Sequence, residues 1–160
     1  HAVQTLLTPE DQRVSLQCIK HHLVPDGRLV VHLDYMGHQN TGWLGNLCRG
    51  KRGVFELGQD LVHPESGRLI RTSHAWTYEP SSQTVSLMMA WEELDANDKV
   101  VSRWERGPMR LHCVFRFEME HLLARVGFEI EAVYGDFFRG ELRDDSSESI
   151  WVAKNRSTGR

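Results

Sequence analysis

Histidine and cysteine are the residues of this chain best suited to metal binding or nucleophilic chemistry, and the sequence holds nine and three of them. Cys18 and His21 are three residues apart and His22 follows directly, but no second pair stands at the spacing that zinc sites use. Cys113 lies in an apolar stretch, which favours a buried, unreactive thiol. No G-x-S-x-G motif marks a serine nucleophile. The sequence therefore predicts no metal site and indicates no catalytic nucleophile.

A glycine-rich segment could bind phosphate, because residues 45–52 read GNLCRGKR and contain the GxxxxGK frame of a phosphate loop. Arg52, however, stands where that motif needs a serine or threonine to hold magnesium, and Gly53 follows where a helix should begin. We interpret the segment as a surface loop.

The composition is that of an ordinary globular protein of one domain or two small lobes. The 160 residues are 40% hydrophobic and 26% charged, with a net charge of −3. This charge argues against a nucleic-acid partner, since phosphate binding needs clustered lysine and arginine. No apolar run is long enough to cross a membrane, and no signal peptide opens the chain. Three cysteines without a disulfide spacing indicate a cytoplasmic protein with reduced thiols.

The first half of the chain predicts a helix and a strand. Thr8 is suited to cap a helix with Pro9 in its first turn, and the apolar residues continue to about Leu23. A turn at Pro25-Asp26-Gly27 leads into RLVVHLD, an apolar run typical of a strand that is covered on both faces. Five glycines between residues 35 and 53 indicate a loop.

Between residues 54 and 115 apolar and polar residues alternate with a period of two. Turn residues recur at Glu65-Ser66-Gly67, Pro80-Ser81-Ser82, Asp95–Asp98 and Gly107-Pro108. This pattern predicts a meander of four or five antiparallel strands joined by short hairpins.

The last third, RLHCVFRFEMEHLLARVGFEIEAVYGDFFRGELRDDSSESIWVAK, predicts a helix that ends at Gly127, a strand, a polar turn and a final strand. One face of this helix carries Met119, Leu122, Leu123 and Val126. The order of elements and the segment HLLARVGFEIEAVYGDF resemble the small-molecule branch of the class I S-adenosylmethionine-dependent methyltransferases. The opening HAVQTLLTPEDQRVSLQCIKHHLVPDGRLVVHLD resembles the stretch of that family from the end of strand four, through a helix, to strand five.

The resemblance implies an α/β fold: a partial Rossmann-like methyltransferase sheet, strands four to seven, with an inserted antiparallel β-meander. Residues 1–53 and 116–154 would form the carboxyl-terminal part of the methyltransferase core. Residues 54–115 would form the inserted lobe, which binds the acceptor or mediates dimerisation, and residues 155–160 a frayed tail.

The resemblance also implies site residues. The loop leaving strand four would border the methionine end of S-adenosylmethionine, with His1, Gln4 and Thr5 as cofactor contacts, although Gln4 and Thr5 could equally form a helix-entry turn. The family's Gly-rich cofactor motif does not occur, which predicts weak or no cofactor binding by these residues alone. Asp34 and Tyr35 follow strand five at the edge where α/β sheets bind ligands. The candidate acceptor contacts among polar and aromatic strand residues are Arg71, His74, Trp76, Tyr78 and Arg116, which could instead belong to a sheet with one solvent-exposed face.

The function so implied is methyl transfer from S-adenosylmethionine to a small-molecule acceptor by a parent protein, with this chain inactive alone. The alternative is a non-enzymatic, cone-shaped α+β module of the nuclear-transport-factor type that binds a ligand or partner. We also expect a homodimer, formed through an unpaired sheet edge, the meander or exchanged elements.

Overall fold

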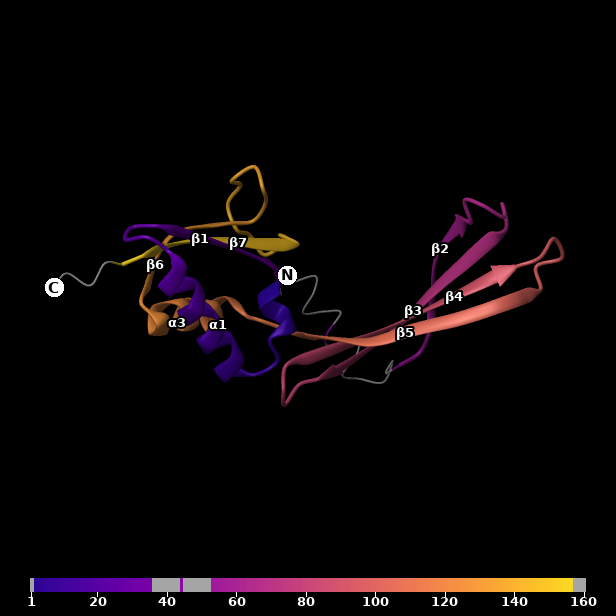
Figure 1. The fold of residues 1–160 in the computed structure, drawn as a ribbon, viewed down its shortest axis with the longest axis horizontal. Helices are drawn as coiled ribbons and strands as arrows, with labels where there is room; N and C mark the ends of the chain where they lie inside the picture. Colours follow the sequence, from indigo (N-terminus) through magenta and orange to yellow (C-terminus); the bar gives the residue numbers. More distant parts are fainter. Residues whose placement is uncertain (1, 36–43, 45–52, 157–160) are drawn as a thin grey trace. The chain divides into compact units, whose positions relative to one another are not determined.

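The computed structural model describes residues 2–35, 44 and 53–156, and the chain divides into two units (Figure 1). Unit 1 comprises His1–Leu44 and Leu111–Arg160, and unit 2 comprises Gly45–Arg110. Unit 2 is therefore an insertion in unit 1. These junctions differ by several residues from the predicted boundaries at 53/54 and 115/116.

Unit 1 is a three-stranded sheet with two helices. Its elements are η1 (Ala2–Thr5), α1 (Pro9–His22), β1 (Arg28–Asp34), α3 (Arg116–Val126), β6 (Phe128–Tyr134) and β7 (Glu148–Asn155). The sheet order is β1-β7-β6, and β7 runs antiparallel to both neighbours. β1 and β6 are consequently parallel, as the predicted strands five and six should be. Residues 2–5 form the short helix η1, and no strand precedes β1 in the described residues.

The first helix begins as the sequence predicts. The Thr8 hydroxyl accepts a hydrogen bond from the Asp11 amide at 3.1 Å, and Pro9 occupies the first helical position. At the other end, the Asn155 side chain donates to the carbonyls of Leu23 and Val24 at 3.2 and 3.3 Å. Asn155, predicted to begin a frayed tail, is instead the buried last residue of β7. That part of the prediction is wrong, because Asn155 satisfies carbonyls at the end of α1 that have no helical partner.

The second helix is bounded by a carboxylate and a glycine. Glu118 accepts a hydrogen bond from the Phe115 amide at 3.2 Å in the first turn. Gly127 ends the helix in the left-handed conformation with φ 86°, which costs glycine little because it has no Cβ. Gly127 as the end of this helix is therefore confirmed.

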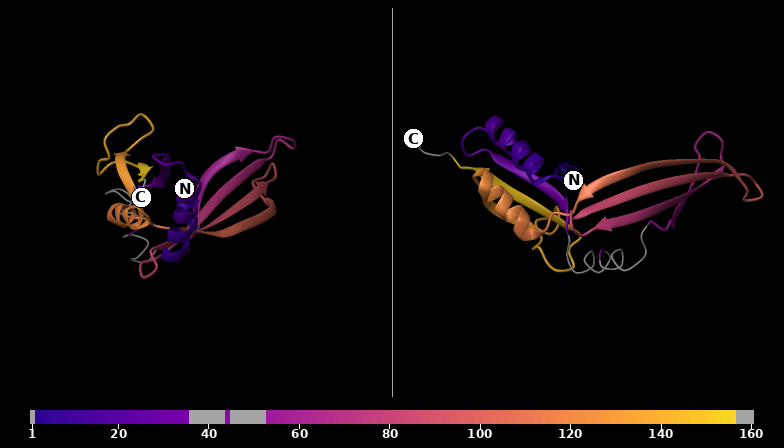
Figure 2. Two further views of the ribbon diagram at one scale, coloured as in Figure 1. Left: turned by 60° about the vertical axis from the view of Figure 1, so that its left-hand side comes forward. Right: turned by 90° about the horizontal axis from the view of Figure 1, so that it is seen from below.

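The core of unit 1 lies between one face of the sheet and the two helices (Figure 2). Its fully buried members are Leu16, Leu33, Met119, Leu123, Trp151 and Ala153. Leu122, predicted to share the core face of α3, is only partly buried against this cluster.

Unit 2 is a four-stranded antiparallel meander, which confirms the predicted pattern. Its strands are β2 (Glu56–Val62), β3 (Leu69–Glu79), β4 (Thr84–Leu94) and β5 (Val100–His112), with β5 ending in unit 1. The order β2-β3-β4-β5 follows the chain, and β3 and β4 pair without interruption from Leu69↔Leu94 to Glu79↔Thr84. β5 stops at His112, so residues 113–115, which the predicted alternating stretch includes, do not belong to it.

In the described part of the chain, no helix combines the length and the apolar character that crossing a membrane requires.

Candidate functional site

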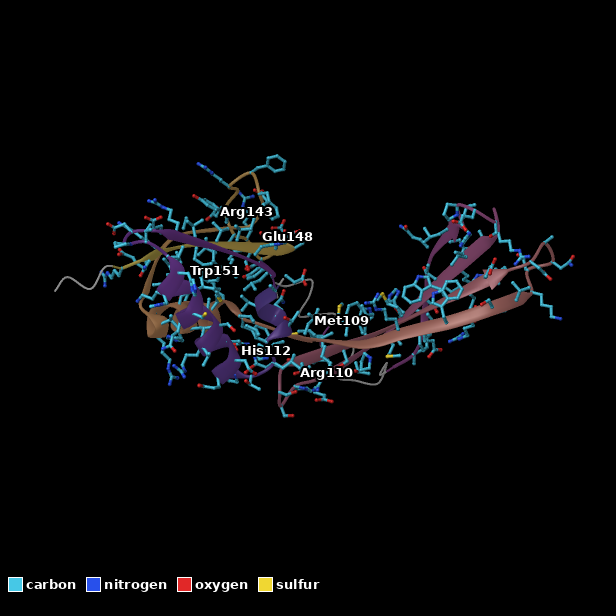
Figure 3. The ribbon with its side chains drawn as sticks, viewed as in Figure 1. Met109, Arg110, His112, Arg143, Glu148 and Trp151 are labelled. Atoms are coloured by element: carbon cyan, nitrogen blue, oxygen red, sulfur yellow. The ribbon has the colours of Figure 1, made fainter. Side chains whose placement is uncertain are left out.

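Three polar side chains gather at one edge of the unit 1 sheet. β1 ends at Asp34, β6 ends at Tyr134, and β7 begins at Glu148 at the same edge because it runs antiparallel to both. In register, Asp34 lies opposite Glu148, and His32 lies two residues before Asp34 on the same face. Ligands of open α/β sheets bind outside the carboxyl ends of the parallel strands, and this is that edge. Figure 3 shows Glu148 at the start of β7.

The closest contact at this edge joins His32 to Glu148. Nε2 of His32 lies 2.5 Å from Oε2 of Glu148, across the diagonal of the β1–β7 pair. The edge of the His32 ring also packs against Phe137, with 4.9 Å between ring centroids. Both partners of the pair are part-buried, so the contact fixes the imidazole while leaving the edge accessible.

Asp34 is the carboxyl group whose surroundings matter most here. Partial burial raises its pKa, the carboxylate of Glu148 raises it further, and His32 acts in the opposite direction. A carboxyl group with a raised pKa at a sheet edge is a candidate hydrogen-bonding partner or proton acceptor.

Gln4 and Thr5, predicted to contact the cofactor, direct their described polar contacts to the chain itself. The Gln4 side chain is buried, and its Oε1 accepts a hydrogen bond from the Asp34 amide at 3.1 Å. The Thr5 hydroxyl donates to the Ala2 carbonyl at 2.7 Å on the exposed side of η1. Gln4 therefore anchors η1 to the ligand edge, whereas His1 lies outside the described residues. The Tyr35 amide donates to Ser147 at 2.9 Å, which joins the end of β1 to the segment before β7.

The candidate acceptor contacts on β3 do not all lie on one face of the strand. His74, Trp76 and Tyr78 alternate along one face of β3, and the rings of His74 and Trp76 meet edge to face at 6.2 Å. Arg71 lies on the opposite face, 3.7 Å from Asp60. Arg116, predicted as a strand residue, begins α3 and pairs with Glu120 at 3.2 Å. That placement in a strand is wrong because α3 begins at Arg116, where the Glu118 carboxylate accepts a hydrogen bond from the Phe115 amide in the first turn.

Sequence reasoning missed a contact between a histidine and a glutamate, His112 and Glu118. His112 is buried, with Nε2 2.7 Å from Oε1 of Glu118, and its Nδ1 has no hydrogen-bond partner among the residues that the structure describes. The next residue, Cys113, is a buried thiol whose pKa rises to about 11 through burial and then through the carboxylates of Asp34 and Glu118. Cys113 is therefore protonated and unreactive at neutral pH, as its apolar sequence context indicates. The six-residue spacing of His112 and Glu118 across a strand end gave no periodic signal.

No three His, Cys, Asp or Glu side chains of the described residues lie close enough together to hold a metal ion.

The fold defined by these elements is α/β: part of a Rossmann-like methyltransferase sheet with an inserted antiparallel β-meander. No family model and no curated protein matches the sequence. Solved structures do match. The CcbJ methyltransferase from Streptomyces caelestis is 18% identical with a TM-score of 0.70, and the match covers 98% of this chain and 57% of that protein.

Two further solved structures are named for sugar substrates. CalS10, an amino pentose methyltransferase from Micromonospora echinaspora solved with S-adenosylmethionine bound, is 20% identical with a TM-score of 0.62, over 96% of this chain and 54% of its own. The sugar N-methyltransferase KedS8 from Streptoalloteichus is 14% identical with a TM-score of 0.63, over 98% and 53%. The chain thus spans about half the length of these proteins.

Proposed function

We propose that this chain is the carboxyl-terminal part of an S-adenosylmethionine-dependent methyltransferase that acts on a small-molecule acceptor. The observation that carries the proposal is the fold match, which extends over 96–98% of the chain to three methyltransferases, two of them named for sugar substrates. The polar edge formed by His32, Asp34 and Glu148 supports it, because ligands of this architecture bind at that edge.

The residues at this edge favour an acceptor that donates hydrogen bonds, such as a hydroxyl or an amine. Two carboxyl groups and an imidazole lie on one face, and each can accept a proton or a hydrogen bond. Methyl transfer by displacement needs alignment and, for a protonated acceptor, a base. In this proposal Asp34 accepts the proton of the acceptor, and Glu148 holds His32 in place beside it.

The two described residues predicted to contact S-adenosylmethionine already make hydrogen bonds within the chain. The Oε1 atom of Gln4 and the hydroxyl of Thr5 already have backbone partners within the chain. The cofactor supplies the activated methyl group when bound, and we expect the isolated 160 residues to bind it weakly or not at all. Calorimetric titration with S-adenosylhomocysteine tests this, and submillimolar binding by the isolated chain would contradict it.

The test of the acceptor site uses the full-length gene product with S-adenosylmethionine and a panel of hydroxyl- and amine-bearing acceptors. Asp34→Asn should lower kcat/KM by about 10²–10⁴-fold, the usual contribution of a general base. Asp26→Asn is the matched control, since Asp26 is paired with Lys154 at 3.0 Å at the other end of β1 and β7. Equal activities of the two variants would exclude Asp34 as the base.

The alternative of a ligand-binding module without enzymatic activity stays a prediction. Such a module would bind its ligand without any dependence on S-adenosylhomocysteine, and the full-length product would transfer no methyl group. The same titrations therefore separate the two functions.

A further inference from the structure

The outer strand of the meander is open along almost its whole length. β5 pairs with β4 on one side, and the described part of the chain supplies no strand for its other side. Every residue from 100 to 110 is exposed, including the large apolar side chains of Val100, Val101, Trp104 and Met109. A long exposed edge with apolar side chains is a template for pairing with another strand.

The charges on one face of β5 are self-complementary. Arg103 and Glu105 lie on the same face, and Arg103 contacts both Glu105 at 2.6 Å and Glu92 of β4 at 2.5 Å. If two β5 strands pair antiparallel about a two-fold axis at Trp104, each Arg103 lies opposite Glu105 of the second copy. Directly opposite residues lie on the same face of the sheet. The two-fold axis must therefore pass through a residue that lies opposite the same residue of the second copy. Moving it to Arg103 or Glu105 would place Val101 opposite Glu105, or Trp104 opposite Arg106.

The other face of β5 supplies aromatic contact in the same register. Trp104 stacks on Trp91 of β4, with 6.4 Å between ring centroids and 12° between ring planes. An axis at Trp104 brings the two Trp104 rings opposite each other and extends this stack into the second copy. Cross-strand aromatic pairs stabilise sheets beyond the area they bury.

The sequence limits the length over which two β5 strands can pair. Pro108 lacks the N–H that a ladder needs, so residues 101–107 are the longest stretch that can pair about this axis. The other edge strand, β2, is less suitable because it has only seven residues and its register shifts between Leu57 and Asp60. The self-complementary edge is therefore β5.

We propose that two copies of this chain associate through antiparallel pairing of residues 101–107 of β5, centred on Trp104. The two meanders then form one continuous eight-stranded sheet. This interface is independent of the proposed methyltransferase activity, since it uses only residues of unit 2.

Charge reversal tests the register. Arg103→Glu and Glu105→Arg should each weaken self-association at least tenfold in analytical ultracentrifugation, because each places like charges opposite one another. An equimolar mixture of the two variants should form a heterodimer about as tight as the wild type, since all four charges are then complementary. Arg68→Glu is the matched control: Arg68 pairs with Glu93 at 3.1 Å, away from the β5 edge, and its reversal should leave association unchanged.

A disulfide provides a readout that does not depend on charge. In a Cys18→Ser, Cys48→Ser background, Trp104→Cys should form an intermolecular disulfide under mild oxidation, because residues directly opposite in an antiparallel pair have Cα atoms about 4.5–5.5 Å apart. Ser102→Cys, on the same face, lies opposite Arg106 of the second copy and should crosslink far less.

A wild-type chain that stays monomeric at high micromolar concentration would overturn the proposal and would show that Arg103, Glu105 and Pro108 protect the edge instead. A dimer that neither charge reversal weakens, or a mixture that does not restore association, would overturn it as well.

Discussion

The two sheets of this chain are stabilised by different means. In unit 1 one face of the sheet packs on α1 and α3, and the fully buried side chains come from both layers, as with Trp151 and Leu123. In unit 2 burial is confined mainly to the inner strands: Ala90 and Leu94 of β4 are buried, whereas β2 and most of β5 are exposed. Unit 1 therefore depends on contacts between layers, and unit 2 on pairing within one layer.

The largest expected difference is between two leucines, one from each unit. Leu123→Ala should lower the free energy of unfolding by ~2–5 kcal/mol, because Leu123 is fully buried in the unit 1 core. Leu61→Ala on β2 should cost less than about 1 kcal/mol, since 49% of Leu61 is already exposed. Urea denaturation of both variants makes the measurement. Similar losses would contradict the contrast between the units.

A smaller effect is expected from the polar link between β7 and α1. Asn155→Ala removes the hydrogen bonds to the carbonyls of Leu23 and Val24 and should cost about 1–3 kcal/mol, because buried acceptors lose their partner. Asn97→Ala in the exposed β4–β5 turn is the control and should change stability by less than about 0.5 kcal/mol. If the two variants were equally stable, the Asn155 side chain would not hold the layers together.

The smallest effect on the free energy of unfolding concerns Asp34, and its size depends on pH. The pKa of Asp34 is raised from the ordinary value of 3.8, so the folded chain holds its proton more tightly than the unfolded chain does. The resulting loss of stability is absent below the ordinary pKa, grows as pH rises towards the folded-state pKa, and is complete above it. Asp34→Asn should therefore stabilise the protein at pH 7 and not below about pH 3. Unfolding at a series of pH values tests this, and a pH-independent difference would argue against it.

Sequence reasoning predicted what local chemistry determines. Thr8 and Pro9 mark the start of α1, Gly127 marks the end of α3, and alternation with turn residues predicts the meander. Each of these signals acts within a few residues, so it can be read from the chain directly.

The contacts of the candidate site could not be predicted in the same way. His32 and Glu148, which are 116 residues apart in the sequence, meet across two strands, and Gln4 reaches Asp34 through a buried side chain with no periodic pattern. Arg71 and His74 are both candidate acceptor contacts by residue type, but strand alternation places them on opposite faces. Register between distant strands depends on the packing of the whole sheet, which local propensity does not encode.

The position of β7 in the middle of the unit 1 sheet has a consequence for synthesis on the ribosome. Arg28 of β1 pairs with Lys154, so more than a hundred further residues must be synthesised after β1 before its partner strand emerges. The meander needs only adjacent hairpins and can form while the chain is still growing, since local contacts close quickly. Until β7 arrives, β1 and β6 have no strand between them, and their apolar faces are open to chaperones and to other nascent chains. We therefore expect the insertion to fold first during synthesis, and the unit that encloses it to fold last.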